Sequence, residues 1–126
     1  MSFLSALTRN VAETSRNHED PRLRTRFYPL SRETVLNSVH QVAGFQKGWT
    51  VVKLDRAEGT LQAEARTQLL KFVDDVTIRV RPADGQRVSV DVVSRSRVGK
   101  GDFGTNARRI VRFLEALDST LAPPKG

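Results

Sequence analysis

Residues 93–113 read Val-Ser-Arg-Ser-Arg-Val-Gly-Lys-Gly-Asp-Phe-Gly-Thr-Asn-Ala-Arg-Arg-Ile-Val-Arg-Phe. This stretch predicts the end of a strand, a glycine-rich turn and the start of a helix. Its glycines mark backbone that must turn tightly or adopt a positive φ. A core element does not need so many cations beside so much glycine, so the stretch is also the candidate site. Its members are the glycines Gly99, Gly101 and Gly104, the cations Arg95, Arg97, Lys100, Arg108, Arg109 and Arg112, and the single opposing acid Asp102.

Before this stretch, apolar residues alternate with polar ones in a period of two, which is typical of half-buried strands. The alternation covers residues 61–66, 76–81 and 88–97. An earlier strand begins at Gly48, with Trp49 and Val51 on one face and Val52 and Leu54 on the other. The sequences Ala57-Glu58-Gly59 and Pro82-Ala83-Asp84-Gly85 predict hairpin turns, so these strands form an antiparallel series.

Two amphipathic helices accompany the strands. Ser31 predicts the N-cap of a helix that runs to about residue 43, where Gly44 marks its end. The second helix follows the glycine turn, is capped by Asn106 or Thr105, and stops before Pro123-Pro124. Its expected buried stripe is Ile110, Phe113, Leu114, Leu117 and Leu121, with Arg108, Arg109, Arg112 and Glu115 facing solvent.

The N-terminal part is less regular. Residues 2–14 predict a short amphipathic helix and residues 15–21 a polar linker. Residues 22–28 predict a first strand, which Pro29 ends. An exposed strand of this kind could also pair between subunits and give an oligomer.

Together these patterns predict the α+β class. We expect one antiparallel sheet of about five strands in the order β-α-β-β-β-β-α, with both helices covering one face. The opposite face is then polar and rich in arginine. The predicted organisation is an N-terminal segment at 1–17, a single domain at 18–121 and a tail at 122–126.

Composition limits the class of protein. A chain of 126 residues fits one domain that buries about two-thirds of the surface its unfolded chain exposes. It therefore needs no disulfide or metal to hold it together. The absence of cysteine excludes a disulfide framework, a thiolate zinc site and a cysteine nucleophile. Apolar runs are too short to span a membrane, and the N-terminus lacks the pattern of a secretory signal. We therefore expect a cytoplasmic protein without a cofactor or metal.

The charge permits an anionic partner. There are 21 Lys and Arg residues against 14 Asp and Glu, a formal charge of +7. Most of the cations are arginines, whose planar guanidinium suits carboxylate and phosphate groups. Nucleic acid, another anionic ligand and an acidic protein all remain open as partners.

The glycine turn matches Gly-x-Gly-x-x-Gly over residues 99–104. A dinucleotide site would also need a parallel strand after the following helix, and the given sequence does not supply one before residue 126. Free N–H groups at the helix start, beside Lys100 and Arg108, would favour an anion. Asp102 or Asn106 capping the same donors is the structural alternative.

Asp74 and Asp75 are the carboxylate pair that opens a buried strand. Adjacent strand residues point to opposite faces, so the two cannot act together as an acid/base pair. We expect one of them to bind Arg95 or Arg97 on the neighbouring strand and to hold the glycine turn. No Ser/His/acid set is apparent.

Three sequence blocks carry a resemblance to a known family. They are Phe72-Val73-Asp74-Asp75-Val76, then Ser94-Arg95-Ser96-Arg97-Val98-Gly99, then Asp102-Phe103-Gly104 with Asn106 and Arg109-Ile110. Over roughly residues 18–118 the chain resembles the bacterial and plastid domain-of-unknown-function family 1499 (DUF1499). The resemblance implies no activity. It implies that Asp74, Asp75, Arg95, Arg97, Asp102, Asn106 and Arg109 form the shared polar cluster of that family.

Three functions follow as hypotheses. The first is a non-catalytic binding domain that holds an anionic partner through Arg95, Arg97, Lys100, Arg109 and Asn106, with Asp74, Asp75, Asp102 and the three glycines as the orienting cluster. The second is a helix-grip-like carrier of a small hydrophobic ligand, with a pocket lined by Trp49, Phe72, Ile78 and Phe113. The third is a metal-assisted hydrolase that uses the region of Asp74 and Asp102.

Overall fold

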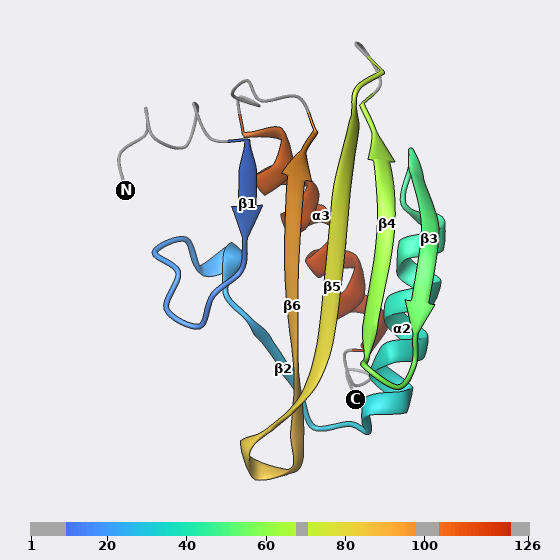
Figure 1. Cartoon of the computed structure of the whole chain (residues 1–126). Coiled ribbons are helices and arrows are strands. Elements are labelled where there is room, and N and C mark those ends of the chain that lie inside the picture. The colour runs from blue at the N-terminus through green and yellow to red at the C-terminus, as the bar shows by residue number, and fades with distance from the viewer. Residues whose placement is uncertain (1–9, 68–70, 98–103, 122–126) are drawn as a thin grey trace.

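A computed structural model describes residues 10–67, 71–97 and 104–121 of the chain. Within them, a six-stranded antiparallel sheet carries two α-helices on one of its faces (Figure 1). The predicted α+β class, single antiparallel sheet and one-sided helices are confirmed. The elements are β1 (Val11–Glu13), η1 (Pro21–Leu23), β2 (Arg26–Tyr28), α2 (Arg32–Phe45), β3 (Trp49–Asp55), β4 (Thr60–Arg66), β5 (Val73–Ala83), η2 (Asp84–Gln86), β6 (Arg87–Ser96) and α3 (Thr105–Leu121).

The strands lie in the order β1-β6-β5-β4-β3, and β2 shares the outer edge of β6 with β1. The β1 strand pairs with residues 93–95 and β2 pairs with residues 88–90. The sheet is therefore five strands wide, as expected, and the additional strand arises because one edge is divided between two short segments.

The helix predicted over residues 2–14 is wrong for Val11–Glu13, which form β1, whereas residues 2–9 lie outside the described part. The edge of β6 offers unpaired backbone groups, and this segment satisfies them. Ser96 N–H donates to Asn10 O at 2.7 Å, and Thr14 N–H donates to Val92 O at 3.0 Å. The folded sheet thus begins before residue 18.

The strand predicted over residues 22–28 is shorter than expected. Pro21–Leu23 form the 3-10 turn η1, because Pro21 favours a first helical position and the Asp20 carboxylate accepts the Arg22 N–H at 2.9 Å. Strand geometry begins only at Arg26.

Helix α2 begins where the sequence predicts and ends later. The Ser31 hydroxyl accepts the Thr34 N–H at 3.1 Å, which confirms the N-cap. Gly44 lies inside the helix and does not end it, because the chain turns further on, at Gly48 with φ 81°.

A β-bulge in β3 changes the predicted alternation. Val51 pairs with Ala63, but the next pair is Lys53 with Gln62, so Val52 is an extra residue and is 60% exposed. The bulge returns Leu54 to the core side, opposite Leu61. The prediction that Val52 and Leu54 share a face is therefore wrong.

The core lies between the sheet and the two helices. The inward residues of β5 and β6 pack against the apolar stripe of α3, in which Ile110, Phe113, Leu114 and Leu117 are buried as predicted. The Trp49 ring stacks on Phe113 with centroids 5.4 Å apart. Among the described helices, none has the length and hydropathy needed to cross a membrane.

Candidate functional site

Asp74 and Asp75 divide the candidate site into two clusters on opposite faces of the sheet. Asp74 points toward α3 and is 2% exposed, whereas Asp75 points to the face without helices, which we call the open face. This separation follows from the alternation of side chains along β5.

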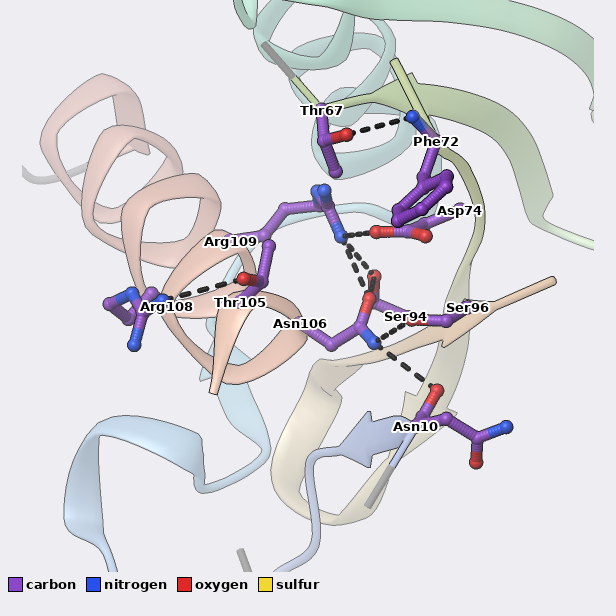
Figure 2. A network of polar contacts seen from close by, with 10 residues as sticks. All are labelled: Asn10, Thr67, Phe72, Asp74, Ser94, Ser96, Thr105, Asn106, Arg108 and Arg109. Atoms are coloured by element: carbon purple, nitrogen blue, oxygen red, sulfur yellow. Dashed lines mark hydrogen bonds and ion pairs between the residues drawn. The ribbon is translucent and has the colours of Figure 1, made fainter. Parts of the chain in front are cut away.

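The inner polar cluster consists of the buried residues Asp74, Ser94, Asn106 and Arg109 together with the half-buried Ser96 (Figure 2). One guanidinium nitrogen of Arg109 lies 2.8 Å from Asp74 Oδ2. The same nitrogen donates to Asn106 Oδ1 at 2.7 Å and to Ser94 Oγ at 3.1 Å. The cluster therefore joins the start of β5, the end of β6 and the first turn of α3.

Asn106 extends this cluster to the N-terminal strand. Its amide nitrogen donates to Ser96 Oγ at 2.9 Å and to Asn10 O at 3.2 Å, and its carbonyl oxygen accepts from Ser94 Oγ at 2.7 Å. A single buried side chain thus bridges α3, β6 and the segment that leads into β1.

The prediction that Arg109 faces solvent is wrong, because its side chain is 6% exposed. Helical spacing explains the error: Asn106, Arg109 and Phe113 are three and four residues apart and share one face. A cation on an apolar stripe needs a buried counter-charge, and Asp74 on the inward side of β5 provides it.

The second cluster lies on the open face. Glu64 on β4 and Asp75 on β5 are direct cross-strand partners, and two like charges in this position repel. Arg97 resolves the repulsion by binding both. It contacts Asp75 Oδ1 at 2.7 Å and Oδ2 at 3.0 Å, and Glu64 Oε2 at 2.6 Å. The hydrogen bonds from Arg97 hold the pKa of Asp75 below its ordinary value.

Arg97 is thus the arginine that binds Asp75, which answers the expectation that either Arg95 or Arg97 would do so. Arg95 stands opposite Asp75 in the register but is exposed, and it makes no ion pair with any described residue. Substitution of Arg97 by glutamate would gather three carboxylates, so its effect on binding could not be separated from its effect on folding.

Further cations on the open face were not in the predicted site. The feature of the sequence that indicates them is the alternation of period two, which exposes one face of each strand to solvent. None of them forms an ion pair within the part of the chain that the structure describes, and each is exposed: Arg66 on β4, and Arg79 and Arg81 on β5.

The glycine turn falls mostly outside the described residues. Gly99, Lys100, Gly101 and Asp102 all lie there, so their predicted roles stay predictions. Gly104 has φ 83°, in agreement with the expected positive φ in this turn.

Two of the residues predicted to line a hydrophobic pocket, Ile78 and Phe113, have no exposed surface, and a third, Trp49, stacks on Phe113. Phe72 is 43% exposed. Within residues 10–67, 71–97 and 104–121, no three His, Asp or Glu side chains come together as metal ligands would.

Comparison with known proteins gives a family and a fold. The family model described as Protein of unknown function (DUF1499) matches residues 4–117. No curated protein matches the chain in sequence.

Solved structures also resemble it, among them the following two. The di-domain ARO/CYC protein BexL from the BE-7585A biosynthetic pathway has 14% identity and a TM-score of 0.54, over 90% of this chain and 48% of that one. This chain therefore spans about half of BexL, and the likeness shows a shared helix-grip fold. A structural-genomics protein from Chromobacterium violaceum has 13% identity and a TM-score of 0.45, over 91% of this chain and 99% of that one.

Proposed function

Since this chain belongs to the DUF1499 family of proteins of unknown function, whose description supplies no activity, we propose a function from the geometry of the open face. The domain is a non-catalytic binding module that holds an anionic partner on this face. One observation carries the proposal: Arg66, Arg79, Arg81 and Arg95 are exposed there without an ion pair to any described residue.

Guanidinium groups that no carboxylate neutralises attract a polyanion when they share one surface. Side chains on one face of a sheet point the same way, so their fields add at that surface. Neither helix covers the open face, and a formal charge of +7 supports long-range attraction.

The roles of the predicted residues change accordingly. Arg95 remains a proposed contact and is joined by the three other exposed arginines. Arg97 orients the surface by neutralising Asp75 and Glu64, while Arg109 and Asn106 hold α3 against the sheet from within. A contact from Lys100 remains a proposal.

The test is binding of fluorescently labelled heparin, a general polyanion, followed by anisotropy over a salt series. Arg79→Gln with Arg95→Gln removes two charges from the open face. Lys47→Gln with Arg112→Gln is the matched control, since both residues are exposed and lie outside the sheet. The first pair should weaken binding and flatten its salt dependence, and the control pair should leave both nearly unchanged. Equal effects from the two pairs would exclude a dedicated face.

The carrier of a hydrophobic ligand is the second candidate, favoured by the helix-grip fold shared with the ARO/CYC protein BexL. A ligand between the helix and the sheet would have to separate Trp49 from Phe113. Native mass spectrometry of the purified protein tests it, since a carrier should retain a bound molecule of constant mass.

A further inference from the structure

The hairpin formed by β5 and β6 extends past the rest of the sheet. The pairing of β4 with β5 ends at Thr60 with Arg79, whereas β5 and β6 remain paired as far as Ala83 with Arg87. Figure 1 shows this two-stranded end projecting below β4 and β3. It presents its open-face side chains where no neighbouring strand obstructs a partner on the β4 side.

These side chains are mainly cations. Arg79, Arg81 and Arg87 share the open face of the hairpin, and within the described residues none of them forms an ion pair. Two acids lie near these cations in the sequence. Asp91 Oδ1 accepts the hydroxyls of Thr14 and Thr25, each at 2.7 Å, and Asp84 lies in the turn.

An aromatic ring organises part of this surface. The guanidinium carbons of Arg87 and Arg16 lie 4.5 Å and 5.0 Å from the centroid of the Phe27 ring. Phe27 is on β2 and pairs with Ser89 on β6. Cation–π contacts of this kind restrict two long side chains before any partner arrives. We call Arg16, Phe27, Arg79, Arg81 and Arg87 the hairpin patch.

The opposite end of the open face is less suited to anions. Arg66, Arg95 and Arg97 lie there beside two acids, Glu64 and Asp75, both of which bind Arg97. The hairpin patch therefore combines four arginines, which have one acid among them, Asp91 opposite Arg79, with a built-in restriction of the movement of Arg16 and Arg87.

We infer that the hairpin patch binds single-stranded nucleic acid, an inference that rests on the proposed anion-binding function of the open face. Phosphates of the nucleic acid contact Arg79 and Arg81. Its unpaired bases stack on the guanidinium planes of Arg16 and Arg87, which Phe27 holds in place. An anionic membrane fits less well because the exposed large apolar side chains of the described residues, Phe45, Val52 and Phe72, lie on α2, on β3 and before β5, away from the patch.

The experiment measures anisotropy of a labelled oligothymidylate of about twelve nucleotides, a length within the range of single-strand sites. Its competitors are the matching duplex, heparin and vesicles with anionic lipid. Arg79→Gln with Arg81→Gln should weaken binding and lower the salt slope by about 1.4, since each lost phosphate contact removes about 0.7. Arg66→Gln with Arg95→Gln removes the same charge from the other end of the open face and should lower the slope by less. Lys47→Gln with Arg112→Gln, which removes two exposed cations outside the sheet, should leave the slope unchanged.

Phe27→Leu tests the cation–π contacts separately from the positive charge of the patch. It keeps every cation but releases Arg16 and Arg87, so the affinity should fall by roughly fivefold or more while the salt slope stays the same. Melting temperatures of all variants establish that the loss of binding is not a loss of fold.

The outcomes distinguish the inference from the function beneath it. Equal losses from the two arginine pairs, or stronger binding of duplex or vesicles than of the single strand, would overturn the inference and leave the proposed function standing. If the protein binds neither heparin nor the oligonucleotide nor the vesicles, both the inference and the proposed function are wrong.

Discussion

A carboxylate and a guanidinium buried together stabilise a fold only while both are present. Removing Asp74 by Asp74→Ala leaves the Arg109 charge buried without its partner, which should lower the free energy of unfolding by about 3–5 kcal/mol. The double variant Asp74→Leu with Arg109→Met should recover much of this loss, because packed apolar side chains can replace a buried ion pair. Urea denaturation measures the parent protein, Asp74→Ala and the double variant, and a double variant no more stable than Asp74→Ala would contradict the prediction.

Two glycines give opposite expectations for the same substitution. Gly44→Ala should stabilise the protein by about 0.5–1 kcal/mol, since Gly44 is exposed within α2 and an added Cβ meets nothing within 4 Å. Gly59→Ala should destabilise it by more than about 1 kcal/mol, because Gly59 has φ 72° and an added Cβ would clash with the backbone oxygen of Val80. Thermal unfolding should therefore show melting temperatures that shift in opposite directions. Shifts of the same sign would mean that the hairpin between β3 and β4 is not held against β5.

Between elements, a tyrosine on β2 is joined to the end of α3. The Tyr28 hydroxyl donates to Asp118 Oδ1 at 2.5 Å, and Arg26 lies 3.0 Å from the other oxygen of the same carboxylate. Burial, and then the hydrogen bond to Asp118, raise the pKa of Tyr28 above its ordinary value of 10.0. The folded protein therefore keeps this proton at a pH where the unfolded chain has lost it.

The sign of the pH dependence follows. The contribution of Tyr28 to stability is complete below about pH 10 and is lost as the pH rises further, since the unfolded state then binds fewer protons. Tyr28 is the only tyrosine in the sequence, so ultraviolet absorbance of the phenolate reports this group alone. We expect no phenolate near pH 10 while the protein is folded, and a weaker alkaline loss of stability in Tyr28→Phe. Ionisation of Tyr28 in the folded protein at pH 10 would show that its hydrogen bond to Asp118 is not formed.

At the scale of the whole molecule, one core predicts one unfolding transition. Trp49 packs on Phe113 at the β3 side of the sheet, and Tyr28 binds Asp118 from β2 at the other side. Trp49 is also the single tryptophan, so its fluorescence and the absorbance of Tyr28 follow opposite sides of the sheet. In urea both signals should change at the same midpoint. Separate midpoints would mean that the divided edge of β6 opens before the core.

The architecture was largely predictable because its strongest signals are long and periodic. The alternation of Val76, Ile78 and Val80 and the helical stripe from Ile110 to Leu117 suffice for a sheet with helices on one face. A strand of three residues such as β1 carries no period, and the extra residue Val52 cannot be detected from alternation alone. The candidate site was predictable in part: Asp75 with Arg97 follows from neighbouring strands, whereas Asp74 with Arg109 requires knowing how α3 packs on β5.

The divided edge and the bulge have a consequence for behaviour at high concentration. On one border of the sheet β1 and β2 are three residues each, and on the other border the extra residue Val52 interrupts β3. Neither border offers a long straight row of free backbone groups on which another chain could build a fibril. We therefore expect concentrated solutions to resist growth of amyloid.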